Sequence, residues 1–541
     1  MDSPVVTQLF RQLFRQHPAC QNLNLNLNQS AKHLARLATC SSAAALSPHH
    51  VRRRQPCFHH HQQRRSLWTP GSGWKRGSGP AIQRNESNWQ QRTALLQRDM
   101  TDEYKHFPMV TAKELRGRRE RPRRVKMFMR DFIEDSLYNP HYGYFSQQVV
   151  IFSPGEPFEF PNLRDEMEFH ELLSKRYRAF EDRLDEAAPS DTRQLWYTPT
   201  ELFRPYYGEA IARYLVDNYK LTTYPYDDLI IYEMGAGRGT LMLNILDYIR
   251  DMDPDVYART QYKIIEISSK LAGVQDSQLK QSAARWHSSS PVAAAAGNRG
   301  HIGKVEIINQ SIFDWSHVVP SPCFFLAFEV FDNFAHDVLR YDLETEAPLQ
   351  GTVLIDDSGD FFEFYVPVLD PTVAHFLKVR HLATSGRYKL PYPASRLGRW
   401  FAANRPGAPN LSNPEYVPTR LMQFFEVLDK YFPAHRLVTS DFHSLPNALP
   451  GLNAPIVQTR YQRRPVPVTT PLVHQGYFDI MFPTDFHRAE AIYQAITGKL
   501  TRVLSHEEFM RRWAYLEETE TQTGENPLLS WYKNASVLTT L

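Results

Sequence analysis

The chain has 541 residues, of which 42% are hydrophobic and 22% charged, with a formal net charge of +3. This length exceeds one ordinary domain and the apolar share allows a sizeable core, whereas the sequence lacks the run of about eighteen apolar residues that a membrane span needs. Residues 1–98 hold fourteen Lys and Arg against Asp2 and Glu86, a net +12, which leaves −9 for the remainder.

Residues 1–98 are predicted to be a mitochondrial transit peptide and disordered basic leader, because the segment is rich in Arg and Ser and almost free of acids. Its first residues, VVTQLFRQLFRQ, place apolar side chains on one helical face beside Arg11 and Arg15. Low-complexity stretches follow at 22–28 and 49–65. The leader predicts import into the mitochondrial matrix. The alternative is a disordered basic tail that binds nucleic acid.

Cysteine is confined to the leader except for Cys323. A single cysteine in the body forms neither an internal disulfide nor a Cys-rich zinc site. Cys323 begins the apolar run CFFLAF, so we expect a buried core residue at the start of a strand. The sequence therefore predicts no metal.

Residues 99–195 are predicted to form a helical entry region that ends in a charged insertion, about Arg164 to Leu195. A basic run from Arg116 to Lys126 could contact nucleic acid or an acidic partner, and the alternative is a solvated linker. We favour the linker and predict no nucleic-acid partner.

Residues 196–345 are predicted to form a Rossmann-like cofactor-binding core around the sequence YEMGAGRGTL. The apolar run DDLIIYEM reads as a buried strand and TLMLNILDYIRDM as a helix, with Gly235, Gly237 and Gly239 between them. Glycines at the carboxyl edge of a sheet let a ligand approach bare backbone. The pattern predicts a nucleotide-type cofactor site. The alternative is a turn at which the helix only packs tightly on the strand.

The spacing of the glycines favours S-adenosylmethionine over a dinucleotide. A dinucleotide fingerprint is G-x-G-x-x-G, with the pyrophosphate on the helix amino terminus, but this chain reads G-x-G-x-G and has Thr240 at the last glycine position. Glu233, two residues ahead of the first glycine, suits a cation better than a phosphate. S-adenosylmethionine carries an ammonium and a sulfonium and no phosphate. An NAD-linked oxidoreductase is accordingly disfavoured.

Two later strand candidates supply further polar groups at the same edge. QYKIIEIS ends in Glu266, which is expected to accept hydrogen bonds from both ribose hydroxyls, unless it is a solvated strand end. KVEIINQSIFDW supplies Ser311, Ile312 and Asp314, which are expected to hold the adenine. Three successive strand ends with suitable chemistry strengthen the cofactor prediction.

These segments, together with four others, resemble segments of the MidA-like S-adenosylmethionine-dependent methyltransferases in the same chain order. The resemblance covers roughly residues 126–500 and implies a divergent, fungal-type member. The family pattern E-x-G-x-G-x-G-T-L and the pattern V-E-x-S-x-x-L-x-x-x-Q are matched by EMGAGRGTL and IIEISSKLAGVQ. Similar elements are FMRDFIEDSLYNPHYGYF, YTPTELFRPYYGEAIARYL, AFEVFDNF and GYFDIMFPTDF. The chain departs from the family at Phe328, at Asn333 and Phe334, and in the charged insertion.

The resemblance implies an α/β fold: a class I Rossmann-like methyltransferase sheet with a helical N-terminal region and an inserted and C-terminal substrate-side cap. The family includes the mitochondrial arginine methyltransferase that assists assembly of respiratory complex I. The implied activity is therefore protein arginine methylation, with an arginine of a complex I subunit as acceptor. The altered residues around Glu329 motivate an alternative, an assembly chaperone that keeps the cofactor pocket but turns over weakly. The sequence gives no signal for an oligomeric state.

An arginine acceptor needs carboxylates, because a guanidinium is protonated at biological pH and attacks poorly until it is oriented. Glu329 and Asp332, just after the fourth strand candidate, are the predicted catalytic residues. The alternative is a helix amino terminus that carries favourable acids. Thr198 and Glu201 are expected to close the cofactor pocket, or else to cap the entry helix.

Residues 346–500 are predicted to hold a cap hairpin over Thr352–Val368, a Pro-rich loop over Leu390–Pro418 and the remaining sheet elements. The last of these include a helix near Leu421–Tyr431 and the strand RLVTSDF, which ends near Asp441. Residues 501–541 are predicted to be a C-terminal helical tail.

Overall fold

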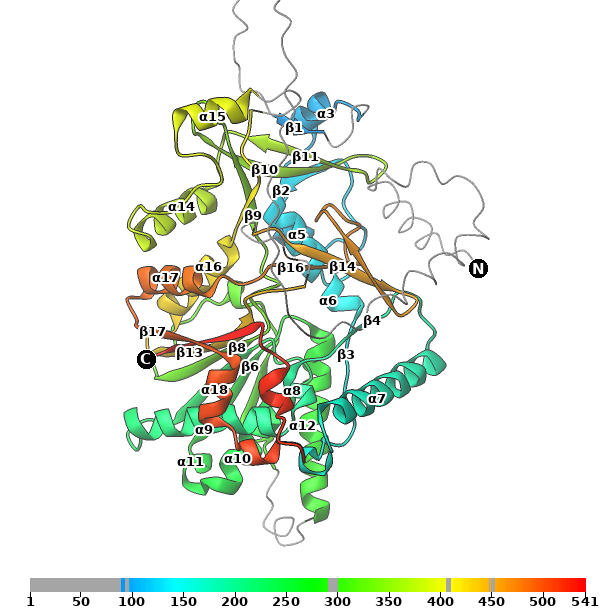
Figure 1. The fold of residues 1–541 in the computed structure, drawn as a ribbon, viewed down its shortest axis with the longest axis vertical. Helices are drawn as coiled ribbons and strands as arrows, with labels where there is room; N and C mark the ends of the chain where they lie inside the picture. Colours follow the sequence, from blue (N-terminus) through cyan, green and yellow to red (C-terminus); the bar gives the residue numbers. More distant parts are fainter. Residues whose placement is uncertain (1–88, 93–96, 290–299, 405–409, 447, 449–452) are drawn as a thin grey trace, which may run out of the picture. The chain divides into compact units, whose positions relative to one another are not determined.

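A computed structural model describes residues 89–92, 97–289, 300–404, 410–446, 448 and 453–541. Residues Asn88–Leu541 belong to one structural unit (Figure 1). The predicted transit peptide lies almost entirely outside the described residues. Within the described part, no helix is both long and apolar enough to cross a bilayer.

A seven-stranded sheet carries the site, with strand order β17–β18–β13–β8–β5–β6–β7. Its strands are β5 (Leu229–Met234), β6 (Thr260–Ile265), β7 (Val305–Ile308), β8 (Cys323–Phe328), β13 (His435–Phe442), β17 (Thr501–Ser505) and β18 (Ala535–Thr540). Strands β5 to β8 and β13 are parallel, and β18 runs antiparallel to both of its neighbours. The chain moves outward from β5 through β6 to β7 and then returns to β8 on the other side of β5. The strand order therefore reverses between β5 and β8, where ligands bind in open α/β sheets.

Both faces of this sheet are buried, which explains its nearly continuous apolar strands. Successive residues of β5, Ile231 and Tyr232, belong to separate hydrophobic clusters on opposite faces. Ile231 shares its cluster with residues of α9 (Tyr206–Thr222), α10 (Thr240–Met252) and α18 (His506–Trp513). Tyr232 shares its cluster with residues of α14 (Pro371–Ala383), α16 (Thr419–Tyr431) and α17 (Phe486–Thr497). Figure 1 shows these two helical layers on either side of the strands, and the predicted α/β class is confirmed.

The entry region is less helical than predicted. Its helices are α3 (Thr101–His106), α4 (Ala112–Leu115), α5 (Met129–Tyr138), α6 (Tyr144–Gln147), α7 (Glu166–Ala187) and the short η2 (Phe160–Asn162), and α8 (Pro199–Leu202) follows the region. Short strands lie between them: β1 (Trp89–Gln91), β2 (Val125–Phe128), β3 (Val149–Ile151) and β4 (Gln194–Trp196). Strands β3 and β4 pair with each other in parallel. The charged insertion is mostly the single helix α7.

A second, antiparallel sheet has the order β1–β11–β10–β9–β12, and β2 also pairs with β10. It contains β9 (Asp337–Tyr341), β10 (Pro348–Ile355), β11 (Phe361–Val366) and β12 (Glu415–Val417). The predicted hairpin is confirmed, with Ile355 opposite Phe361 and Gly359 in the turn at φ +84°. The predicted loop Leu390–Pro418 is wrong in part, because it contains β12 and the helix α15 (Arg396–Ala403).

A three-stranded sheet of order β15–β14–β16 completes the cap side. Its strands are β14 (Ile456–Tyr461), β15 (Arg464–Val468) and β16 (Asp479–Met481). The long helix α12 (Ser269–Ser289) follows β6. Short helical segments elsewhere are α11 (Pro254–Ala258), η3 (Ile312–Asp314), η4 (Leu516–Glu518) and α19 (Pro527–Ser530).

The prediction of a helical tail over residues 501–541 is wrong in part, because two strands lie there beside the helices α18, η4 and α19. The segments TRVLS and ASVLTT form β17 and β18, and β18 inserts between β13 and β17. Both segments are rich in β-branched residues, which favour a pleated surface once neighbouring strands are present. The sheet of the predicted core 196–345 is therefore completed by three strands from outside that range.

The basic run is solvated only in part: Arg118, Arg119, Arg123 and Arg124 are exposed, whereas other cations of the run contact the rest of the unit. Arg116 donates to the carboxylate of Asp314 at 2.5 Å. The guanidinium of Arg121 lies 4.8 Å from the ring centre of Tyr477, and Lys126 belongs to strand β2. These cations are used to fix the entry region to the rest of the unit.

Candidate active site

A cavity of about 840 Å³ lies at the carboxyl edge of the seven-stranded sheet. Its walls come from the ends of β5, β6 and β8, from the segment after β7, from the entry region and from β14 and β16. Eight of the predicted site residues line it: Thr198, Gly235, Gly237, Glu266, Ser311, Ile312, Glu329 and Asp332. Four others do not line it: Glu201, Glu233, Gly239 and Asp314. The cavity thus occupies the point at which the strand order reverses.

The glycine turn depends on left-handed backbone. Gly235, Gly237 and Gly239 have φ angles of +74°, +53° and +82°, a region that L side chains rarely adopt. Gly239 is the residue that precedes helix α10. A Cβ atom on Gly237 would lie 3.0 Å from Cδ1 of Ile151, a residue of β3. The turn therefore brings bare main chain to the cavity wall.

Glu266 follows the second strand, β6, directly and is 3% exposed. Its Oε1 accepts a bond from the backbone N–H of Ser268 at 2.9 Å, and its Oε2 accepts one from Nε2 of Gln275 at 2.9 Å. The same Nε2 donates to the carbonyl of Gly237 at 3.0 Å, which ties the carboxylate to the glycine turn. Each carboxylate oxygen keeps a lone pair for one further donor, which fits a sugar diol. The alternative of a solvated strand end is wrong.

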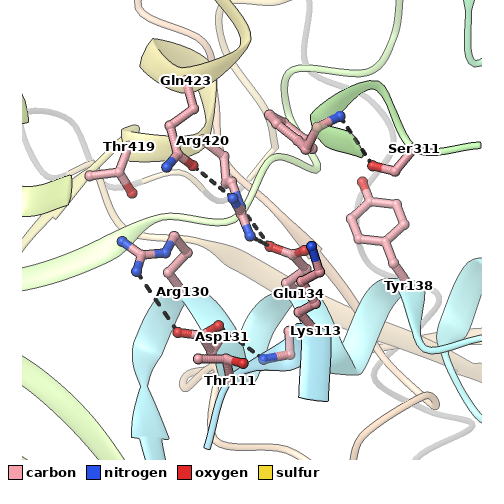
Figure 2. A network of polar contacts seen from close by, with 12 residues as sticks. Thr111, Lys113, Arg130, Asp131, Glu134, Tyr138, Ser311, Thr419, Arg420 and Gln423 are labelled. Atoms are coloured by element: carbon pink, nitrogen blue, oxygen red, sulfur yellow. Dashed lines mark hydrogen bonds and ion pairs between the residues drawn. The ribbon is translucent and has the colours of Figure 1, made fainter. Parts of the chain in front are cut away.

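The third strand end supplies Ser311 and Ile312, which line the cavity beside Gln310. The hydroxyl of Ser311 accepts the backbone N–H of Phe313 at 3.3 Å (Figure 2) and so begins the turn η3. Asp314 is held outside the cavity by its ion pair with Arg116. The geometry therefore supports Ser311 and Ile312, but not Asp314, as contacts for a base.

An ion pair that sequence reasoning missed stands beside this wall. Arg420 of α16 donates from Nε to Glu134 of α5 at 2.6 Å and from Nη1 to Gln423 at 2.7 Å. Figure 2 shows the pair near Tyr138 and Ser311. Arg420 and Glu134 both line the cavity. They lie 286 positions apart in the chain, and no local pattern indicates their contact.

Glu233 and Glu201 support the glycine turn from behind. Glu233 accepts the hydroxyl of Tyr262 at 2.8 Å, and burial raises its pKa to about 7. Glu201 accepts the hydroxyl of Thr240, the first residue of α10, at 2.5 Å. Thr198 accepts the backbone N–H of Glu201 at 3.3 Å, so the capping alternative holds for this threonine. These contacts position the turn. Glu233 bonds to Tyr262 and does not line the cavity, so its placement does not favour the predicted direct contact with a cation.

Glu329 follows β8 directly in a left-handed conformation, with φ +53°. Its backbone N–H donates to the carbonyl of Ser440 at 2.9 Å. Within the described residues its carboxylate accepts no hydrogen bond, and burial together with the nearby Asp441 raises its pKa well above the usual range. No helix begins here, because β9 follows at Asp337. The alternative of a helix amino terminus is wrong, and the strained backbone is typical of functional positions.

Asp332 is 4% exposed, and its Oδ1 has no hydrogen-bond partner in the described part of the chain. Burial raises its pKa well above the usual range, and three neighbouring carboxylates add to the rise. Oδ2 of Asp441, at the end of β13, accepts the backbone N–H groups of Val330, Phe331 and Asp332 at 3.1, 2.7 and 3.3 Å. Asp441 therefore holds the turn that presents Glu329 and Asp332.

Asp479 of β16 is a fourth acid that sequence reasoning missed. Its Oδ1 accepts the side-chain amide of Asn333 at 2.9 Å. Among the described residues, Glu329, Asp332, Asp441 and Asp479 form no ion pair with Lys, Arg or His, although such pairs are frequent elsewhere in the unit. The group is therefore a concentration of buried or half-buried acids without a neighbouring cation, and a bound cation would stabilise their charged form. No set of three or more His, Cys, Asp or Glu side chains in the described ranges is arranged to hold a metal ion.

The raised pKa of Asp479 leads to a prediction about how stability depends on pH. Burial raises the pKa of Asp479 to about 7 in the folded protein, against about 4 in an unfolded chain. Folding therefore favours the protonated form of Asp479. Its contribution to the free energy of unfolding is fully present below about pH 4 and is lost as the pH rises to about 7. We expect Asp479→Asn to gain stability relative to the unmodified protein by roughly 2–4 kcal/mol as pH rises over this window. Urea unfolding at several pH values checks this, and a pH-independent difference would contradict it.

Comparisons with known proteins place the chain in a family. Residues 210–504, more than half of the 541, match a family model described as "Putative S-adenosyl-L-methionine-dependent methyltransferase". A protein of Schizosaccharomyces pombe named "Protein arginine methyltransferase NDUFAF7 homolog, mitochondrial" is 26% identical over 407 residues, which are 72% of this chain and 80% of that protein.

Solved structures are similar at lower identity. A protein of Burkholderia thailandensis, solved with S-adenosyl-homocysteine, is 14% identical, with a TM-score of 0.45 over 77% of this chain and 88% of that one. The glycopeptide N-methyltransferase MtfA, solved with S-adenosyl-L-methionine, is 9% identical, with a TM-score of 0.25 over 62% of this chain and 93% of that one.

The family match and the cavity agree on the cofactor. Left-handed glycines and a buried carboxylate with free lone pairs fit a nucleoside that carries a sugar diol, as predicted. The chain belongs to the S-adenosyl-L-methionine-dependent methyltransferase family that the matching model describes, and S-adenosyl-L-methionine is its cofactor.

Proposed function

We propose that this methyltransferase modifies an arginine side chain of a protein, a subunit of respiratory complex I, in the mitochondrial matrix. The similarity to the S. pombe protein that is named as a mitochondrial protein arginine methyltransferase supports the acceptor class and the organelle. The resemblance to MidA-like methyltransferases supports the complex I subunit, and the basic, acid-poor leader supports import.

The observation that carries the arginine assignment is the buried Oδ1 of Asp332, which has no hydrogen-bond partner in the described part of the chain and lies near Glu329. A buried acid without a partner is costly, and the described part of the chain supplies no cation to either residue. A guanidinium is planar and permanently charged, and it donates to two carboxylate oxygens at once. A bound arginine would therefore neutralise the acids and fill their hydrogen-bonding capacity.

When bound, the cofactor supplies a methyl group on a positively charged sulfur. The acceptor nitrogen forms one bond to that carbon while the sulfur–carbon bond breaks, the sulfur keeps the electron pair, and one proton leaves the nitrogen. Glu329 and Asp332 are proposed to orient the guanidinium, since most of the barrier reduction in such a transfer comes from positioning and fixed charge. Oδ1 of Asp332, with its raised pKa, is the proposed acceptor of the proton.

Gly235 and Gly237 are proposed to leave room for the cofactor, Glu266 to accept its ribose hydroxyls, and Ser311 and Ile312 to contact its adenine. All five line the same cavity as Glu329 and Asp332. The acceptor and cofactor sites would therefore adjoin at the end of β8.

The test is to incubate the protein and S-adenosyl-L-methionine with mitochondrial matrix proteins and complex I subunits. We expect mass spectrometry to find the mass of one or two methyl groups added to arginine, and Asp332→Asn to reduce this product to background. Glu306→Gln is the matched control, because Glu306 is an exposed acid at the opposite end of β7. Cofactor binding without arginine methylation would contradict the proposal and favour the assembly chaperone.

A further inference from the structure

Helix α15 presents an apolar face to solvent. Leu397, Trp400 and Phe401 are 72%, 58% and 64% exposed. Their spacing of three and four residues places them on one side of the helix. The rings of Trp400 and Phe401 lie 5.1 Å apart at 75°, so they form one continuous surface. Three large apolar side chains exposed together indicate a contact surface.

The opposite side of α15 is anchored, so the apolar face has a fixed direction. Arg399 is 8% exposed and donates to the carbonyl of Ala394 at 2.6 Å and to Glu346 at 2.5 Å. The hydroxyl of Ser395 caps the helix by accepting the N–H of Gly398 at 3.1 Å. The outward direction of Trp400 therefore follows from the packing of its neighbour.

The chain segment that contains α15 carries charge of one sign. Residues 371–414 contain seven Lys and Arg and no Asp or Glu. Arg387, Lys389 and Arg396 are exposed and form no ion pair with any described residue, whereas Arg380 and Arg399 of the same segment pair with Glu415 and Glu346. The exposed apolar side chains are thus flanked by cations that are available to an external anion.

We propose that α15 docks this protein on an anionic phospholipid surface. A helix with Trp, Phe and Leu on one face and Lys and Arg around it is the composition that lies in a membrane interface. Trp prefers the level of the lipid headgroups, and anionic headgroups attract the flanking cations. The helix lies on the surface and does not span it. Figure 1 shows α15 at the opposite end of the described ribbon from α10 and α11.

The test must separate α15 from the basic leader, since an amphipathic basic segment also binds anionic vesicles. Hydrogen exchange of the full chain is therefore measured segment by segment, with vesicles of phosphatidylcholine alone or mixed with phosphatidylglycerol. We expect the mixed vesicles to slow amide exchange in residues 396–403 by roughly tenfold. Phosphatidylcholine alone leaves the exchange unchanged, and added salt removes the protection.

The variant Trp400→Ser/Phe401→Ser should abolish the protection of residues 396–403 while its leader still binds the vesicles. Its matched control is Leu221→Ser/Tyr226→Ser, which removes two side chains that are 83% and 89% exposed at the end of α9 and should leave the protection intact. Unprotected α15 in the vesicle-bound protein, or equal protection in the α15 variant, would overturn the proposal. Protection by an acidic protein but not by vesicles would equally overturn it.

Discussion

Glu329→Gln is expected to lower kcat for the proposed arginine methylation by about 10²–10³, because it removes the charge that we propose to orient the guanidinium. The affinity for S-adenosyl-L-methionine should change by less than about threefold, which corresponds to well under the 1.4 kcal/mol of a tenfold effect. Glutamine has the same shape, and the carboxylate of Glu329 accepts no hydrogen bond in the described part of the chain, so the fold loses no contact. Steady-state kinetics and calorimetry of cofactor binding measure the two quantities.

The pH profile distinguishes a direct role of Glu329 from a structural one. Burial and Asp441 raise the pKa of Glu329 well above the usual range, so the free enzyme needs a higher pH than an ordinary glutamate to hold the charge. We expect kcat/KM to rise with pH through this ionisation, and this dependence to change in Glu329→Gln. Glu306→Gln should keep both rate and profile. Unchanged turnover in Glu329→Gln would reject the assignment.

Local pattern was sufficient for the cofactor half of the site. The apolar run, the three glycines and the amphipathic helix predicted β5, the turn and α10, and each is present. The parallel arrangement then gathers the ends of β5, β6 and β7 at one edge, which is why Glu266 and Ser311 line the same cavity as Gly237. Glu201, Glu233, Gly239 and Asp314 were predicted as cofactor contacts and do not line the cavity. For Asp314 the reason is that the sequence does not reveal its ion pair with Arg116, 198 positions away.

The acceptor half could be predicted only in part, because it is built from long-range contacts. The sequence singled out Glu329 and Asp332. The hydrogen bonds by which Asp441 holds their turn join residues 109 to 111 positions apart, and the bond between Asn333 and Asp479 joins residues 146 positions apart. No residue-level signal shows that Glu329 adopts a left-handed conformation, which is rare for glutamate. The same reason explains the missed strands β17 and β18, whose β structure depends on pairing with β13.

Gly237→Val is expected to weaken cofactor binding by roughly 10–100-fold, because its side chain would occupy space at the cavity wall that the ligand needs. A β-branched residue at φ +53° also costs about 1–3 kcal/mol of folding stability. Its Cβ would also lie 3.0 Å from Cδ1 of Ile151, so the turn would have to move. Movement of the Gly237 carbonyl would break its bond from Gln275, which also donates to Glu266. Calorimetry with S-adenosyl-L-methionine measures the loss, and Gly237→Ala provides a milder variant in case the valine protein is unstable.

The control separates strain from the loss of ligand space. Gly498 follows α17 with φ +67°, and a Cβ atom there would meet no heavy atom within 4 Å. Gly498→Val therefore imposes similar backbone strain, about 1–3 kcal/mol, away from the cavity. It should lower the free energy of unfolding as much as Gly237→Val does without altering cofactor affinity. If both variants bound the cofactor equally well, bare main chain at Gly237 would not be what admits it, and the placement of the cofactor against this turn would be wrong.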